Sequence, residues 1–126
     1  MNKPMIAIPM GDPAGIGPEI VVKAIADEQV QKTAVCLVIG DQRVLARAIQ
    51  ICNTPLMIHL VDTPDQALDE KGVLNLVDLA NADPAAFEMG KVSALCGQAA
   101  YEYIAKSIEL ANKRAVDAVA TTPINK

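Results

Sequence analysis

Three glycines and two prolines fall within the nine residues from Gly11 to Glu19, which read Gly-Asp-Pro-Ala-Gly-Ile-Gly-Pro-Glu. Glycine tolerates positive φ and lets the backbone approach a ligand closely. Pro18 suits the first turn of a helix, where its missing N–H costs no hydrogen bond. The N–H groups that follow have no acceptor within the helix and lie at the positive end of its dipole, so they can bind a phosphate or a carboxylate. Glu19 favours the same dipole and can equally keep an anion out.

The spacing of this loop differs from two common nucleotide-binding motifs. A dinucleotide fingerprint needs G-x-G-x-x-G, and Ile20 stands where the third close glycine belongs. The loop also lacks the G-K-[S/T] ending of a P-loop, so the sequence gives no support for nucleotide hydrolysis. An anion-binding role and a purely structural Gly/Pro turn both stay open.

A second polar loop follows the apolar residues 118–120 and has the sequence Thr121-Thr122-Pro123-Ile124-Asn125-Lys126. Hydroxyl, amide and ammonium groups after the carboxyl end of a strand suit an anion site in an open α/β sheet. A polar turn with a solvated lysine explains the same residues equally well.

The other reactive side chains have structural interpretations. Asp41 follows the second apolar run; an acidic residue there can hold a ribose, but capping the next helix is the favoured interpretation. His59 is the only histidine and lies inside an apolar run, which indicates a hydrogen-bonded structural residue. The cysteines are odd in number and widely spaced in apolar patterns, so reduced core thiols are expected at Cys36, Cys52 and Cys96.

The elements that must position these loops alternate between strand and helix. Continuous apolar runs predict strands of a buried parallel sheet at about residues 5–10, 34–39, 56–61, 73–77 and 118–120. Periodic apolar residues predict helices over about 18–27, 42–51 and 92–114. The stripe expected to face the core on the last helix consists of Val92, Leu95, Cys96, Ala99, Ala100, Tyr103, Ile104, Ile108 and Ala111. Residues 62–72 are expected to be a loop or short helical turn, and the long connector 78–90 a lid or contact loop.

The composition limits the function. The 126 residues, 52% of them hydrophobic and only 2% aromatic, suffice for about one domain with an aliphatic core. A net charge of −4 without a basic stripe argues against nucleic acid as a partner. No apolar window is long enough for a membrane span and no signal-peptide pattern is present, so a cytoplasmic location without a membrane partner is expected. A final strand with no covering helix predicts that residues 1–126 are the incomplete N-terminal α/β part of a longer, two-domain protein.

Three motifs together resemble the 4-hydroxythreonine-4-phosphate dehydrogenase family of pyridoxal phosphate biosynthesis. They are the Gly11–Glu19 loop, a Gly-x-x-Ser-x-x-x-Gly helix start from Gly90 to Gly97, and a Thr-x-Pro-Ile-Asn-Lys loop from Thr121 to Lys126. The resemblance covers essentially the whole chain, and the nearer branch acts on 4-phospho-D-threonate or 4-phospho-D-erythronate. The first motif is also similar, more distantly, to the opening loop of isocitrate and isopropylmalate dehydrogenases.

The resemblance implies an α/β fold, the N-terminal portion of an isocitrate/isopropylmalate-dehydrogenase-like α/β/α sandwich. It implies a homodimeric enzyme that oxidises C3 of a phosphorylated four-carbon hydroxy acid, such as 4-hydroxythreonine 4-phosphate, with NAD and a divalent metal before decarboxylation. The metal would lower the pKa of the alcohol and stabilise the enolate, and the nicotinamide would accept the hydride. The cofactor-side residues would be Gly11, Asp12, Gly15, Ile16 and Gly17. The substrate-side loop would supply Thr121, Thr122, Asn125 and Lys126.

The resemblance also implies that the catalytic groups lie elsewhere. In that family the metal ligands are histidines beyond the position of Lys126, and His59 corresponds to none of them. No metal ligand is therefore expected within residues 1–126, and this part alone is expected to be inactive. Two alternatives stay open: a family member that oxidises an unphosphorylated cyclic diol carboxylate, and a non-catalytic anion-binding α/β module.

Overall fold

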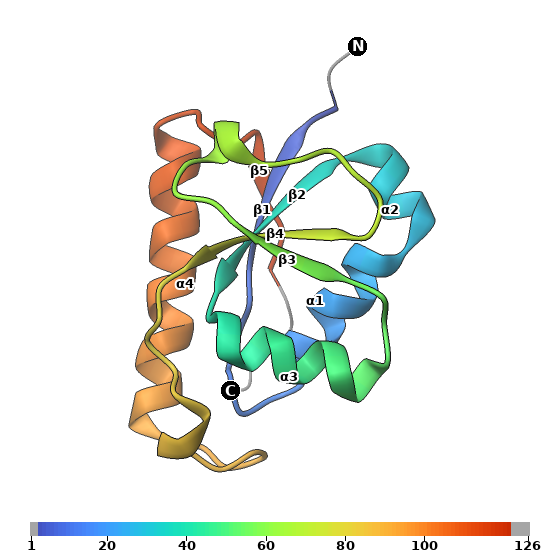
Figure 1. Cartoon of the computed structure of the whole chain (residues 1–126). Coiled ribbons are helices and arrows are strands. Elements are labelled where there is room, and N and C mark those ends of the chain that lie inside the picture. Colours follow the sequence, from blue (N-terminus) through green and yellow to red (C-terminus); the bar gives the residue numbers. More distant parts are fainter. Residues whose placement is uncertain (1–2, 122–126) are drawn as a thin grey trace.

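Five parallel strands form one sheet in the order β3-β4-β2-β1-β5 (Figure 1). A computed structural model of the chain describes residues 3–121. The strands are β1 (Met5–Pro9), β2 (Val35–Gly40), β3 (Met57–Leu60), β4 (Val73–Asp78) and β5 (Ala118–Val119). In the centre, β1 pairs with β2 from Met5↔Val35 to Pro9↔Ile39. The predicted parallel α/β sheet is therefore confirmed, with all five strands near their expected positions.

Helices cover both faces of this sheet and make three layers (Figure 1). On one face α1 (Gly17–Ala26) packs against α3 (Gln42–Cys52), and α2 (Glu28–Thr33) follows the end of α1. On the opposite face α4 (Ala94–Asn112) packs on β1 and β2. Short 3-10 turns, η1 (Pro64–Gln66) and η2 (Pro84–Ala86), interrupt the two long loops. Within residues 3–121, none of these helices combines the length and apolarity that a membrane span requires.

Two details of the strands and helices differ from expectation. Helix α2 was not predicted, because none of its residues is buried and its sequence has no apolar stripe. Its start is capped by Asp27, whose carboxylate accepts a hydrogen bond from the backbone N of Gln29 at 2.8 Å. Strand β3 lies at the sheet edge, where Met57 is 76% and Leu60 50% exposed. The edge position leaves β3 less buried than the central strands.

The core is aliphatic, as the composition predicted. Its central side chains include Leu37, Val38, Ile39, Leu45, Leu74 and Leu76, all fully buried. All three cysteines are free thiols; Cys96 is buried, whereas Cys36 and Cys52 are only half-buried. Burial raises the pKa of the Cys36 thiol above its ordinary value, which keeps it protonated.

Helix α4 is shorter than predicted and buries a narrower stripe. It begins at Ala94 and ends at Asn112. Its buried residues are Cys96, Ala99, Tyr103, Ser107 and Leu110. Three residues of the expected stripe are exposed instead: Val92 by 86%, Leu95 by 37% and Ile108 by 49%. The sheet accepts only one face of this helix, so apolar residues on either side of that face remain uncovered in the described part of the chain.

Candidate functional site at the carboxyl edge of the sheet

The two polar loops of the sequence leave neighbouring strands at the same edge of the sheet. Strand β5 pairs with β1 through Ile6↔Ala118 and Ala7↔Val119. The backbone N of Ala120 then donates to the carbonyl of Ala7 at 3.0 Å. Thr121 follows directly and is exposed. The other predicted substrate-side residues, Thr122, Asn125 and Lys126, lie outside the described residues.

The Gly11–Glu19 loop is a tight turn that leads directly into α1. Gly11 has φ of +83°, a conformation that strains any L side chain. The carboxylate of Asp12 accepts a hydrogen bond from the backbone N of Ala14 at 2.8 Å, and the Asp12 carbonyl accepts from Gly15 N at 3.0 Å. Asp12 therefore holds the turn with both side chain and main chain. The predicted need for glycine is confirmed at Gly11.

Helix α1 starts without a side-chain cap. Its N-cap residue is Ile16, which is 61% exposed and offers no hydrogen-bonding side chain. Gly17 and Pro18 form the buried first turn, and Glu19 follows within it. The backbone donors of this turn therefore suit an anionic ligand, as the sequence suggested.

Asp41 lies fully buried at the end of β2 and caps α3, the favoured interpretation of this residue. It accepts hydrogen bonds from the backbone N of Arg43 at 2.8 Å and of Ala82 at 2.9 Å. The Arg43 guanidinium donates to both carboxylate oxygens, at 3.2 and 3.0 Å. Burial alone would raise the pKa of Asp41, but these hydrogen bonds outweigh burial and hold the pKa below its ordinary value. Asp41 is therefore a structural anion.

The connector after β4 runs along this edge and ends against the glycine-rich loop. Near its start, Leu79 N donates to the carbonyl of Gly40 at 2.9 Å. Near its end, Gly90 N donates to the carbonyl of Ala14 at 2.7 Å. Gly90 adopts φ of +79°, and Ser93 caps α4 by accepting from Cys96 N at 3.2 Å. The Gly90–Gly97 motif therefore joins a positive-φ turn to a helix cap, and the connector is a contact loop.

A further contact holds the connector to α4 and was not visible in the sequence. The hydroxyl of the fully buried Tyr103 donates to the side-chain oxygen of Asn81 at 2.7 Å, and the amide of Asn81 in turn donates to Glu102. These partners are 21 and 22 residues apart along the chain. No motif marks the pair, because the contact depends on how α4 packs.

His59 lies in a structural environment. It lies on the edge strand β3, with Nε2 at 3.2 Å from the carbonyl oxygen of Gln66. Over the part of the chain that the structure describes, no group of three or more His, Cys, Asp or Glu side chains could hold a metal ion. Residues 3–121 therefore do not by themselves fit a metal centre.

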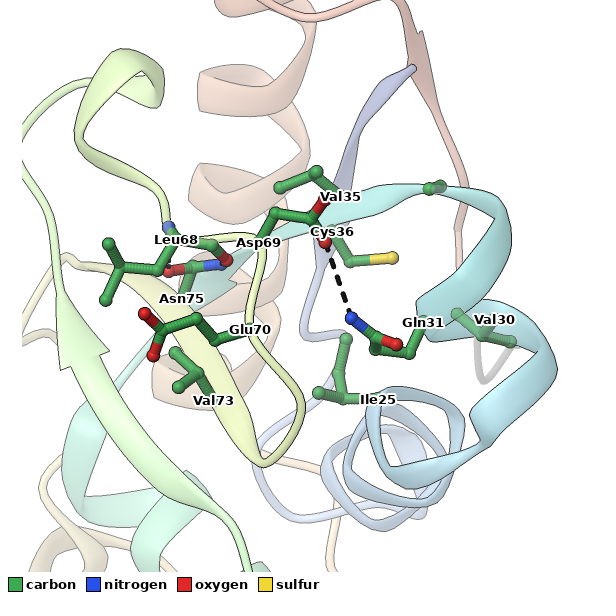
Figure 2. Close-up of a pocket in the computed structure, with 11 residues that line it drawn as sticks. Ile25, Val30, Gln31, Val35, Cys36, Leu68, Asp69, Glu70, Val73 and Asn75 are labelled. Carbon is green, nitrogen blue, oxygen red and sulfur yellow. Dashed lines mark hydrogen bonds between the residues drawn. The ribbon is translucent and has the colours of Figure 1, made fainter. Parts of the chain in front are cut away.

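A small pocket lies at the opposite, amino end of the strands (Figure 2). It is lined by Gln31 of α2, Asp69 of the loop before β4, and Asn75 of β4, among others. Its cavity volume of about 30 Å³ holds roughly one water molecule. Two of the lining residues accept hydrogen bonds from the Lys3 ammonium: the carbonyl of Gln31 at 2.8 Å and the carboxylate of Asp69 at 3.0 Å. This pocket is too small for a substrate, and none of its lining residues belongs to the Gly11–Glu19 loop.

Comparison with known proteins finds relatives over nearly the whole chain. A Fusobacterium nucleatum protein provisionally named D-threonate 4-phosphate dehydrogenase is 51% identical over 121 residues, covering 96% of this chain and 36% of that protein. A solved 4-hydroxythreonine-4-phosphate dehydrogenase from Burkholderia phymatum is 40% identical with a TM-score of 0.94, covering 100% of this chain and 38% of the other. A terephthalate 1,2-cis-dihydrodiol dehydrogenase from Burkholderia xenovorans is 34% identical with a TM-score of 0.72, covering 94% and 33%.

The chain thus spans between 33% and 38% of the length of these proteins. The family described as pyridoxal phosphate biosynthetic protein PdxA matches residues 32–126, which is most of the chain. Because that match takes in the connector, the Gly90–Gly97 helix start and the Thr121–Lys126 loop, and the fold agrees as well, the chain belongs to the PdxA family.

Proposed function

We propose that the complete polypeptide of which these residues form part is an NAD- and metal-dependent dehydrogenase of a phosphorylated four-carbon hydroxy acid. It would oxidise the hydroxyl at C3, after which the product loses CO2. The observation that carries the proposal is the 51% identity over 96% of this chain to the Fusobacterium protein provisionally named D-threonate 4-phosphate dehydrogenase. The pairing of β1 with β5, the strands that precede the two motif loops, supports it, because ligands of open α/β sheets bind at the carboxyl ends of the strands.

Among possible substrates we favour 4-phospho-D-threonate. The relatives with this name are 46% to 51% identical to the chain, whereas the solved 4-hydroxythreonine-4-phosphate dehydrogenases are 36% to 40% identical. Both substrates carry a carboxylate, a secondary alcohol at C3 and a phosphate ester. They differ at C2, which bears a hydroxyl in 4-phospho-D-threonate and an amino group in 4-hydroxythreonine 4-phosphate. 4-Phospho-D-erythronate, the diastereomer, is the third candidate.

The described residues fit one side of a dinucleotide site. We propose that Gly11, Asp12, Gly15, Ile16 and Gly17 form this side. The uncapped start of α1 supplies backbone donors for a phosphate, and Asp12 keeps the turn in shape by accepting from Ala14 N. When bound, NAD would accept the hydride from the substrate. Thr121, Thr122, Asn125 and Lys126 would form the neighbouring edge of the substrate site.

We propose, from the family resemblance, that the metal ligands lie beyond Lys126. We also propose that the complete protein is a homodimer and works in the cytoplasm. These points rest on the family resemblance, and this part alone would be inactive.

The decisive experiment uses the complete purified polypeptide with NAD and a divalent metal such as Mg²⁺ or Zn²⁺. We expect NADH formation and one CO2 released per NADH with 4-phospho-D-threonate, and slower turnover with 4-hydroxythreonine 4-phosphate. Unphosphorylated D-threonate serves as the matched control and should react poorly. Absence of NADH with all three phosphorylated acids would refute the proposal.

A second function is favoured by one specific observation. The Burkholderia terephthalate 1,2-cis-dihydrodiol dehydrogenase shares the fold with 34% identity, and its name refers to a cyclic diol. If a cyclic diol carboxylate produced NADH while every phosphate ester failed, this alternative would replace the first. The third alternative, a non-catalytic anion-binding module, would instead show tight binding of a phosphate ester to residues 1–126 by calorimetry.

A further inference from the structure

Residues 79–90 of the connector, here called the strap, contact the end of β2 and the Gly11–Glu19 loop, which are both far from the strap in sequence. The strap leaves β4, passes the end of β2 through the Ala82–Asp41 hydrogen bond, and ends at the 2.7 Å hydrogen bond from Gly90 N to the Ala14 carbonyl. Through this last bond the strap contacts the middle of the Gly11–Glu19 loop. This bond joins the last residue of the strap directly to the loop.

One side chain of α3 holds that end of the strap. The guanidinium carbon of Arg47 lies 5.6 Å from the centre of the Phe87 ring, within cation–π range. The same guanidinium donates through Nη2 to the Met89 sulfur at 2.9 Å. Arg47 thus contacts the strap at Met89 and Phe87, which lie one and three residues before Gly90. Phe87 itself packs against the hydrophobic core, so the ring is a fixed platform for the guanidinium.

Arg47 and Met89 also close against the loop itself. Together with Pro13, Gly15, Pro18 and Glu19 they line a cavity of only about 10 Å³, so the strap, the loop and α3 are packed there. Within the described residues Arg47 makes no ion pair, and its partners there are the Phe87 ring and the Met89 sulfur. Arg47 therefore lies where α3, the strap and the Gly11–Glu19 loop pack together.

We propose that Arg47 is a positioning residue that fixes the strap to α3 and, through Gly90, holds the Gly11–Glu19 loop in its binding conformation. The link between this conformation and NAD rests on the proposed function. This role requires the planar guanidinium group, which can stack on the Phe87 ring and at the same time donate a hydrogen bond in its own plane to the Met89 sulfur. A lysine carries the same charge but does not reproduce this geometry.

Hydrogen–deuterium exchange on the complete polypeptide tests the contact without relying on activity. In Arg47→Gln we expect the amides of Gly90 and Gly15 to exchange about fivefold faster, since one cation–π contact is lost. Lys32→Gln removes an exposed positive charge from α2 and is the matched control; it should leave both amides unchanged. Unchanged exchange at Gly90 in Arg47→Gln would overturn the proposal. Faster exchange at Gly90 with an unchanged exchange rate at Gly15 would also overturn the proposal, because the loop would then be independent of the strap.

Kinetics separate positioning from direct binding of an anion. For positioning, Arg47→Gln should raise the KM for NAD severalfold and leave kcat within about twofold, and Arg47→Lys should behave like Arg47→Gln. Full recovery by Arg47→Lys would mean that the charge itself binds the ligand, which would overturn the proposal. If the wild-type protein formed no NADH, the proposed function would fail, yet the exchange experiment would still decide whether Arg47 holds the strap and the loop.

Discussion

Asp41 accepts four hydrogen bonds at the end of β2, two from the guanidinium of Arg43 and two from the backbone N of Arg43 and Ala82. Its side chain is fully buried, so the ionised form depends on these donors. The same carboxylate caps α3 and anchors the strap. Asp41 therefore connects β2, α3 and the strap.

The lowered pKa of Asp41 makes part of the stability depend on pH. Because the pKa is lower in the folded state than the value of about 3.9 in the unfolded chain, the stabilisation is complete above about pH 5 and is lost as pH falls through the folded-state pKa. We expect Asp41→Asn to lower the free energy of unfolding by about 1 to 3 kcal/mol at pH 7. Its loss of stability between about pH 5 and 3 should be shallower than that of the wild type.

Urea unfolding at a series of pH values measures both effects. Asp62→Asn, which removes an exposed carboxylate, is the control and should follow the wild type closely. Equal slopes for Asp41→Asn and the wild type below pH 5 would contradict the assignment of the acid-dependent stability to Asp41.

Tyr103 provides a second residue-scale prediction. Burial, and then the negative charges of Asp41, Asp78 and Glu102, raise the pKa of its phenol far above the ordinary value. A raised folded-state pKa means that stability is complete below about pH 10 and falls as pH rises above it. Tyr103→Phe should remove this alkaline loss and cost about 1 kcal/mol at neutral pH through the missing bond to Asn81. Urea unfolding at neutral pH and above about pH 10 measures both effects. Tyr101→Phe, at a position that is 66% exposed, is the control.

At the scale of elements, strands were predictable because β/α alternation requires apolar runs between polar loops. The runs before Gly40 and Asp78 became β2 and β4 with boundaries within one or two residues of expectation. Helix α2 could not be predicted, since it is six residues long and buries none of them. The apolar stripe of α4 was overestimated because periodicity gives the width of the apolar face, while the sheet decides how much of it is covered.

Helix α2 should therefore depend on its cap. Asp27→Ala removes the carboxylate that accepts from Gln29 N at 2.8 Å and Val30 N at 3.3 Å, at a cost of about 1 kcal/mol. Because no residue of α2 is buried, we expect local opening, seen as about fivefold faster exchange of the Gln31 and Ala34 amides, with little change in the global unfolding free energy. Asp65→Ala, in an exposed 3-10 turn, is the control. A large global loss would mean that α2 is part of the cooperative core.

At the scale of the whole molecule, the sequence predicted that each motif loop follows the carboxyl end of a strand in an open α/β sheet. It did not indicate that β5 lies directly beside β1, since strand order depends on which face each crossover helix takes. Arg47 was not identified either. Its contact with Met89 spans 42 residues, and an arginine on an amphipathic helix is an ordinary surface residue until the fold brings the strap onto it.

The same view of the whole molecule predicts how the complete protein should respond to metal. His59 is the only histidine of these residues, and it lies on the edge strand β3, separated from β1 by β4 and β2, with its ring beside the Gln66 carbonyl. If the metal ligands lie beyond Lys126, His59→Ala should leave metal binding intact. A metal that binds only the folded protein raises its unfolding temperature with concentration. We therefore expect Mg²⁺ or Zn²⁺ to raise the unfolding temperature of wild type and His59→Ala equally, and a chelator to abolish NADH formation in both. Loss of the metal-induced rise in His59→Ala alone would place a ligand on β3 and contradict the proposed position of the metal site.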